Sequence, residues 1–187
     1  MNTRAHPDGL TRCSWVTDDP TYLQYHDEEW GNPNRGQQQL FEAICLEGFQ
    51  AGLSWITILS RREGFRKAFH NFEITKVAAM GHQEIDLLMQ DPGIIRNRAK
   101  IQSTIKNAGI VLDKKINLVE LIWKHESQTK TKTAAEFEFR SESPESKALS
   151  KELKSLGFSF VGPTTMYALM QSSGVVKDHA PDCFRSA

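Results

Sequence analysis

The sequence predicts an all-α protein, on three observations. Apolar residues recur with helical spacing in almost every periodic segment, and no segment alternates apolar and polar residues for long enough to predict a sheet. Glycine and proline stand where these helical patterns stop. The chain of 187 residues fits one domain with a substantial core, so residues 1–187 are expected to form a single unit.

The first expected helix lies in QQQLFEAICLEG, where Leu40, Phe41, Ile44 and Cys45 form one apolar stripe. This stripe predicts that Cys45 lies in the core. The segment SWITILSRREGFRKAF continues the helical pattern, and ITKVAAM and EIDLLMQ predict shorter helices. After the break in DPG, a longer helix is expected from about Ile94, followed by a short one in NLVELIWKH.

Residues 126–146 are polar, rich in Ser, Thr, Lys and Glu, and show no helical stripe. They predict a surface loop rather than a linker, because about forty residues follow, which is too few for a second core.

Two further helices are expected on either side of the tight connection between Gly157 and Gly162. Leu149 and Leu153 lie on a stripe that ends at Gly157, and Pro163 suits the first turn of the next helix. The pattern is typical of a helix-hairpin-helix, which can turn backbone N–H groups toward a DNA phosphate. A helical corner without any DNA contact is the alternative.

Composition favours a soluble protein of the cytoplasm without membrane contact. Hydrophobic residues make up 39% of the chain, and no apolar run approaches the length of a membrane span. The first ten residues lack the apolar core of a signal peptide. With 23 basic and 23 acidic residues, net charge neither indicates nor excludes a nucleic-acid partner.

Cysteine and histidine occur near both ends of the chain. Three residues separate His179 and Cys183, a spacing at which both side chains can reach one zinc ion, whereas twelve separate Cys13 and His26. A Cys2His2 site built from both pairs would fix the two ends to each other with no open coordination position. Taken singly, a cysteine is usually a core residue and a histidine a surface residue.

Several long segments together resemble the DNA-3-methyladenine glycosylase I family of bacteria. They are RCSWV with DPTYLQYHDEEWG, LFEAICLEGFQAGLSWITIL, KVAAM, DPGIIRNRAKI, LGFSFVG with YALMQSSG, and the final DH and C, and they cover roughly residues 12–183. The resemblance implies a helix-hairpin-helix glycosylase that hydrolyses the N-glycosidic bond of 3-methyladenine in double-stranded alkylated DNA. It also implies one structural Zn²⁺ bound by Cys13, His26, His179 and Cys183, and we expect a monomeric enzyme of DNA repair.

Chemistry of the lesion indicates what the base pocket needs. Methylation at N3 makes the adenine cationic and already a good leaving group, so extruding and gripping the base supplies much of the catalysis. By the resemblance, Glu47 is the carboxylate that recognises the base; alone, it would be an ordinary glutamate at a helix end before Gly48. Tyr22, Tyr25 and Trp55 match the aromatic pocket of the family.

Trp15 is a further candidate for that pocket, although aromatic residues at such spacing are more often core residues. Other glycosylases of this class place a catalytic aspartate in a V-D-x-H segment after the hairpin. Here the segment is VVKDH, so Lys177 takes the aspartate's place and Asp178 is displaced by one. This agrees with reliance on a labile substrate, and the absence of lysine from GFSFVGP argues against lyase activity.

DNA contacts are expected on two loops and one helix. Gly52 and Leu53, between Glu47 and Trp55, are candidates for a plug that fills the vacated base position. Phosphate contacts are expected from Gly157, Gly162, Arg96, Arg98 and Lys100, although a charged helix face is usually only solvated.

Two other classes of function remain compatible with the residues. A DNA-binding protein without catalysis could keep the hairpin and the zinc site. A hydrolase could use the metal directly, with three protein ligands and an open water position.

Overall fold

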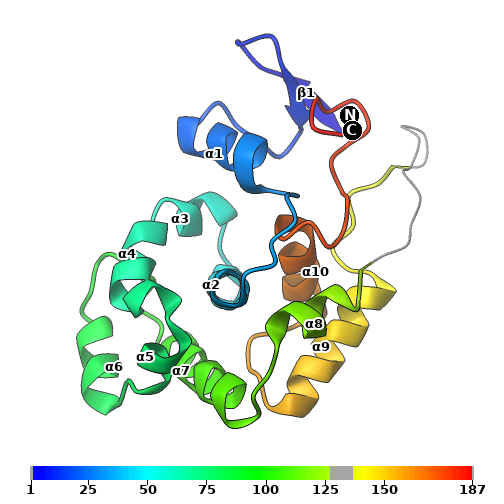
Figure 1. The fold of residues 1–187 in the computed structure, drawn as a ribbon. Coiled ribbons are helices and arrows are strands. Elements are labelled where there is room, and N and C mark those ends of the chain that lie inside the picture. The colour runs from blue at the N-terminus through cyan, green and yellow to red at the C-terminus, as the bar shows by residue number, and fades with distance from the viewer. Residues whose placement is uncertain (1, 127–136, 187) are drawn as a thin grey trace.

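Helices make up most of the structure, as the periodicity of the sequence predicts (Figure 1). The computed structural model describes residues 2–126 and 137–186. Within these ranges, no helix is both long and apolar enough to cross a lipid bilayer.

A small sheet at the N-terminus was not predicted. Strands β1 (Thr3–Ala5) and β2 (Thr11–Cys13) pair antiparallel, with Thr3 opposite Cys13. The expectation of no sheet was wrong here because strands of three residues are too short to produce a visible alternation.

The aromatic stretch after β2 is helical, which was also not predicted. Helix α1 (Pro20–Gln24) is capped by the Asp19 side chain, which accepts hydrogen bonds from the backbone N–H groups of Thr21 and Tyr22. It runs directly into a π-helical turn, η1 (Tyr25–Glu29). Such turns are rare and often occur at functional sites.

The next helices follow the predicted order. They are α2 (Gln37–Gln50), α3 (Trp55–Leu59), α4 (Arg62–Ala68), the 3-10 turn η2 (His70–Phe72), α5 (Ile74–Ala78), α6 (His82–Leu88), α7 (Arg98–Asp113) and α8 (Leu118–Trp123). Two boundaries differ from the prediction. The segment from Ser54 to Phe69 is broken between α3 and α4, and α7 begins at Arg98 rather than near Ile94, since the Asn97 side chain caps it.

Helices α9 (Pro144–Leu156) and α10 (Pro163–Ser172) pack against each other after the predicted loop. Of residues 126–146, those numbered 127–136 lie outside the described residues. The last three are helical rather than part of a loop, because Ser143 and Ser146 form reciprocal caps at the start of α9. Gly157 ends α9 at φ 105°, a left-handed conformation that favours glycine.

Two hydrophobic clusters organise the molecule. The larger surrounds α2, which Figure 1 shows end-on among the other helices and which packs against α3, α7, α8 and α10. It contains the buried Cys45, confirming that prediction.

The smaller cluster joins the two ends of the chain, which lie side by side in Figure 1. Its buried residues are Cys13, Val16, Tyr25, Trp30, Leu59, Phe137, Ala180 and Cys183. Trp55 packs against both clusters, so the start of α3 lies at the boundary between them.

Candidate functional site

A cavity of about 440 Å³ opens where the two clusters meet. Its lining comes from η1, the segment 32–36, α2, α3, α4 and the end of α10. This volume lies within the usual range for small-molecule sites. Glu47, Tyr25 and Trp55, the residues that the family resemblance assigns to a base pocket, all line this cavity.

Glu47 stands on α2 and is only 4% exposed. The Ser172 hydroxyl donates to its Oε1 at 3.2 Å, while its buried Oε2 has no hydrogen-bond partner among the described residues. Burial raises the pKa of Glu47 to about 8, against the smaller opposing effect of the Ser172 hydrogen bond. The cavity therefore holds a carboxyl group whose second oxygen is available to a ligand.

Aromatic rings form the wall next to this carboxyl. Tyr25 and Trp55 lie with ring centroids 5.4 Å apart at 43°. The Trp55 indole N–H is buried, and no group in the described part of the chain accepts from it. Burial, and next the charge of Glu47, raises the pKa of Tyr25 well above its usual value, so its phenol stays protonated and is a donor.

Trp15 and Tyr22 lie outside this lining, and their part in binding a base stays a prediction. Their rings pack against each other at 5.2 Å, and Trp15 also contacts His26 and Trp30 at 5.3 and 5.0 Å. Both residues pack on the smaller cluster, behind the turn that carries Tyr25.

Charged residues at the cavity were not predicted. Arg62 forms two hydrogen bonds with Glu29, at 2.5 and 2.8 Å, and Arg66 donates to Glu42 at 2.8 Å. The spacing of four between the two arginines in RREGFR places them on one helix face, which is the signal that could have indicated them. Ser172 could have been suspected from its place in the QSSG motif.

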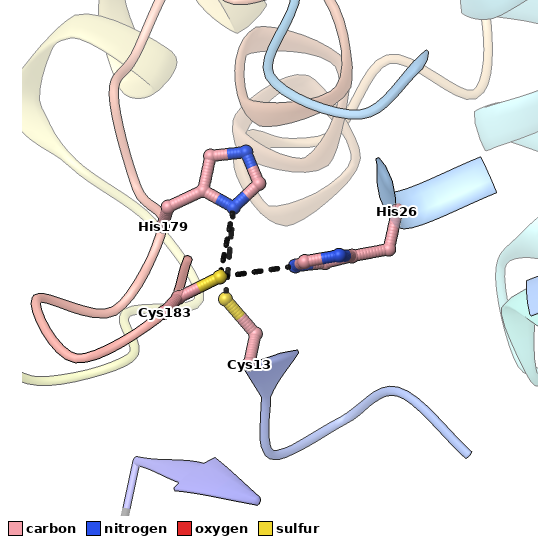
Figure 2. A group of neighbouring side chains, drawn as sticks. All are labelled: Cys13, His26, His179 and Cys183. Carbon is pink, nitrogen blue, oxygen red and sulfur yellow. Dashed lines mark hydrogen bonds between the residues drawn. The ribbon is translucent and has the colours of Figure 1, made fainter. Parts of the chain in front are cut away.

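Four side chains from the two ends of the chain point toward one another (Figure 2). The ligand atoms of Cys13, His26, His179 and Cys183 all lie within 4.8 Å of one another. Cys183 Sγ is 3.5 Å from His26 Nε2 and 3.7 Å from His179 Nδ1, and Cys13 Sγ is 3.8 Å from His179 Nδ1. Tetrahedral zinc with ordinary Zn–S and Zn–N bonds spaces its ligand atoms about 3.3–3.8 Å apart.

Each of the two histidines has a hydrogen-bond partner at its second ring nitrogen, as metal-binding histidines usually do. Asp27 Oδ1 lies 2.8 Å from His26 Nδ1, and Asp27 is in turn held by Arg12. His179 Nε2 donates to the Trp30 carbonyl at 3.2 Å.

Gly31 allows His179 to approach this closely. At its φ of +81°, a Cβ atom would lie 2.8 Å from His179 Nε2.

The hydrogen bond with Cys13, followed by those with His179 and His26, lowers the pKa of the Cys183 thiol and so favours its thiolate, the form of cysteine that binds metals. Two sulfurs and two imidazole nitrogens at these distances fit a closed Cys2His2 metal site.

A family model described as methyladenine glycosylase matches residues 15–186. The chain belongs to the methyladenine glycosylase family. It is 47% identical over 180 residues to DNA-3-methyladenine glycosylase 1 of Escherichia coli K12, covering 93% of this chain and 96% of that protein. It is 48% identical over 179 residues to the DNA-3-methyladenine glycosylase of Haemophilus influenzae, covering 92% of this chain and 96% of that protein.

Solved structures of the family have the same fold. A crystal structure of 3-methyladenine DNA glycosylase I matches with a TM-score of 0.89 and 44% identity, covering 94% of this chain and 100% of that chain. The Staphylococcus aureus enzyme, described in terms of 3-methyladenine recognition, matches with a TM-score of 0.84 and 33% identity, covering 94% and 96%.

The loop and hairpin residues predicted to contact DNA lie at the surface or close to it. Gly52 and Leu53 are exposed between α2 and α3. Gly157 and Gly162 are partly exposed on either side of the α9–α10 connection. Both loops are therefore accessible to a large partner.

The three predicted cations differ from one another. Arg96 is exposed, and Arg98 is exposed and paired with Asp86. Lys100 is buried, and its ammonium group donates to the carbonyls of Phe49 and Ala51 at 2.9 and 2.7 Å. The prediction of a phosphate contact was therefore wrong for Lys100, which instead caps the C-terminal end of α2.

Asp178 is also engaged inside the protein. It accepts hydrogen bonds from the Tyr167 hydroxyl at 2.9 Å and from the Gln171 amide at 2.7 Å, and it does not line the cavity. This aspartate therefore anchors the segment after α10 and does not face the cavity as a general base would.

Proposed function

We propose that this protein is a DNA glycosylase that hydrolyses the N-glycosidic bond of 3-methyladenine in double-stranded alkylated DNA and leaves an abasic site. One observation carries the proposal: the unpartnered Glu47 Oε2 and Trp55 N–H lie on a cavity walled by aromatic rings. Such a cavity suits a flat base that is cationic and rich in hydrogen-bonding groups. The family membership and the names of the relatives support it.

Glu47 explains how the cavity would favour the cationic base. With a pKa of about 8, its carboxyl is mostly neutral near pH 7 when nothing charged lies beside it. A cationic base in the cavity favours the carboxylate, which then accepts a hydrogen bond from the exocyclic amine. Part of the binding free energy would thus come from charge pairing that a neutral base cannot provide.

The reaction needs little further assistance from the protein. As the bond between the base and C1′ breaks, its electron pair enters the ring and neutralises the positive charge. A water oxygen bonds to C1′, its proton passes to solvent, and neutral 3-methyladenine leaves. Because the lesion supplies its own leaving-group activation, extrusion and positioning of the nucleotide would be the main contributions of the enzyme.

We infer that Zn²⁺ binds at the Cys2His2 cluster. When bound there, it would serve as a structural cross-link, because Cys13, His26, His179 and Cys183 supply all four tetrahedral positions. The four ligands disfavour the alternative of a catalytic metal, which requires an open position for water or substrate.

We further infer that α9 and α10 act as a helix-hairpin-helix, with the backbone near Gly157 and Gly162 at a DNA phosphate. Leu53 and Gly52 would occupy the space that the extruded base leaves. The α9–α10 connection contains no lysine, which supports a monofunctional enzyme without lyase activity. We expect residues 1–187 to act as one domain and a monomer, on chromosomal DNA in the bacterial cytoplasm.

The direct test is to incubate the purified protein with methylated duplex DNA and to identify the released bases by chromatography. We expect release of 3-methyladenine with intact but abasic strands. A protein that binds the duplex and releases no base would instead be a DNA-binding protein without catalysis. Strand cleavage that forms a covalent adduct in the presence of borohydride would contradict the monofunctional assignment.

A further inference from the structure

Two large hydrophobic side chains are exposed on neighbouring loops. Leu53 is 42% exposed after α2, and Phe160 is 39% exposed in the α9–α10 connection. The ammonium group of Lys100 lies between the two loops, 2.7 Å from the Ala51 carbonyl and 6.0 Å from the Phe160 ring centroid. Leu53 is two residues before Trp55, which lines the cavity, so the Leu53 loop leads directly into the cavity wall.

Phe160 has an unusual backbone conformation for an aromatic residue. Its φ is 58°, in the left-handed region where glycine is the usual residue and a bulky side chain is an outlier. Strain of this kind persists only when the surrounding structure enforces it, and it concentrates at functional sites.

The surrounding structure does enforce it. On one side, the Asn107 amide binds the Ser159 backbone twice, accepting from its N–H at 3.0 Å and donating to its carbonyl at 3.1 Å. On the other side, the Ser150 hydroxyl donates to the Val161 carbonyl at 2.6 Å. The residues before and after Phe160 are thereby fixed, and its ring is left exposed.

Gly48 of α2 completes the arrangement. A Cβ at this position would lie 3.4 Å from the Phe160 Cβ, so α2 and the connection approach each other closely there. The connection is consequently fixed to the helix that carries Glu47 as well as to α7.

We propose that the Phe160 ring is a second apolar contact with duplex DNA, stacking on a base or sugar next to the extruded nucleotide, beside Leu53. This inference rests on the proposed function, since a glycosylase must hold open a duplex that has lost a stacked base. Continuity with the Leu53 loop, to which Lys100 connects it, favours DNA as the occupant. The exposed Lys106, whose ammonium group lies 3.3 Å from the Ser159 hydroxyl, adds a positive charge that suits a phosphate backbone.

Phe160→Gly separates this role from a structural one. Glycine relieves the left-handed strain but adds conformational entropy to the unfolded chain, and because the two effects oppose each other the variant should unfold at nearly the same temperature as the unchanged protein. Its affinity for a duplex with an abasic-site analogue, measured by fluorescence anisotropy, should fall by about five- to a hundredfold, the usual range for a lost aromatic stack. Binding of free 3-methyladenine should not change, because Phe160 does not line the cavity.

Phe139→Ala is the matched control, because Phe139 is an equally exposed aromatic residue at 38% and should not affect DNA binding. If Phe160→Gly lowers stability, Phe160→Leu decides, since it keeps apolar bulk under the same backbone constraint but cannot stack. Unchanged DNA affinity in whichever of these variants is stable would overturn the proposal. An unchanged protein that releases no 3-methyladenine would refute the proposed function instead.

Discussion

Glu47 is a carboxyl group in an environment that disfavours its charge. It is 4% exposed, it has one hydroxyl donor, and its pKa is raised to about 8. A group of this kind lowers the stability of the empty protein and contributes only when a cation arrives. Among the described residues, the Glu47 carboxylate therefore has no positively charged partner until a cationic ligand binds.

Folding stability should depend on pH through this residue. Below about pH 4.5 the carboxyl is protonated in both the folded and the unfolded chain, so it contributes no pH dependence. Between about 4.5 and 8 the unfolded chain loses the proton while the folded protein keeps it, so stability falls as pH rises.

Glu47→Gln removes this titration. Relative to the unchanged protein, the variant should gain up to a few kcal/mol between pH 5 and pH 8.5, since one pKa unit corresponds to about 1.4 kcal/mol. Urea unfolding of both proteins at the two pH values measures the difference. A difference that does not change with pH would contradict the assigned pKa shift.

The same substitution should impair excision. Glutamine keeps the shape of the side chain but loses a charge-assisted hydrogen bond to the base, an effect of about 1.5–3 kcal/mol. Single-turnover release of 3-methyladenine should therefore fall by roughly ten- to a hundredfold while DNA binding survives. Glu126→Gln, at an exposed position, is the control. Full activity in Glu47→Gln would mean that Glu47 is only structural.

Selectivity for cationic over neutral bases is expected because Asp178, the candidate general base, does not line the cavity. Asp178, the nearest counterpart of an aspartate base, is held by Tyr167 and Gln171 away from the lining. We therefore expect release of 3-methyladenine but not of hypoxanthine or uracil, which are neutral and need activation as leaving groups. Chromatography of products from duplexes that contain each base tests this. Efficient release of either neutral base would mean that another residue acts as a general acid or base at the cavity.

At the level of elements, α7 holds two loops in fixed positions. Lys100 binds the end of α2 and Asn107 binds the α9–α10 connection, and their spacing of seven positions places both on one face of the helix. One rigid helix therefore sets the distance between the loop of Gly52 and Leu53 and the α9–α10 connection.

Lys100→Met should lower both the stability of the protein and its rate of base release. Methionine fills a similar volume but leaves the carbonyls of Phe49 and Ala51 without their buried donor, which should cost about 1–3 kcal/mol of stability. Urea unfolding gives the stability, and base release on methylated DNA gives the activity, which should also fall. Lys151→Met, at an exposed position on α9, should change neither. Unaltered stability of Lys100→Met would show that these hydrogen bonds contribute little.

Sequence reasoning predicted long elements well and short ones poorly. The stripe of α2 and the flanking glycines of the α9–α10 connection are local patterns, so periodicity and backbone preference suffice to find them. The two strands have only three residues each, too few for a visible alternation, and η1 packs on the cluster that joins the two ends of the chain, which no local pattern records. Lys100 was misassigned for a related reason: a cation on a helix looks alike in sequence whether it faces water or a neighbouring carbonyl.

At the level of the whole molecule, the candidate site was predicted in part. Glu47, Tyr25 and Trp55 came from the family resemblance, and all three line one cavity. The four candidate zinc ligands were suggested by the cysteine and histidine residues near both ends of the chain, and then by the resemblance, and their atoms converge. The ion pairs at the cavity could not be predicted, because Arg62 and Glu29 are far apart in sequence and share no spacing rule.

Loss of the metal site should affect stability far more than chemistry. Cys183→Ala removes one of four ligands, and a loss of even 2 kcal/mol would lower the unfolding temperature by about 4–8 °C. Differential scanning calorimetry measures this, and base release per folded molecule should stay within a few fold. Cys45→Ala, also a buried cysteine, is the control: chelators should lower the stability of this variant as they do that of the unchanged protein. A Cys183→Ala protein that keeps both its zinc and its stability would contradict the assignment.

Trp55 packs on both hydrophobic clusters, and this has a consequence for partial unfolding. Tyr25 belongs to the smaller cluster and Glu47 to α2, so the two halves of the cavity rest on different cooperative units. If the smaller cluster, which joins the two ends of the chain, unfolds first, the protein loses half of its base site. The helices of the larger cluster would still be protected from hydrogen exchange. The free energy of that local opening, rather than of global unfolding, would then set the temperature at which the enzyme stops working.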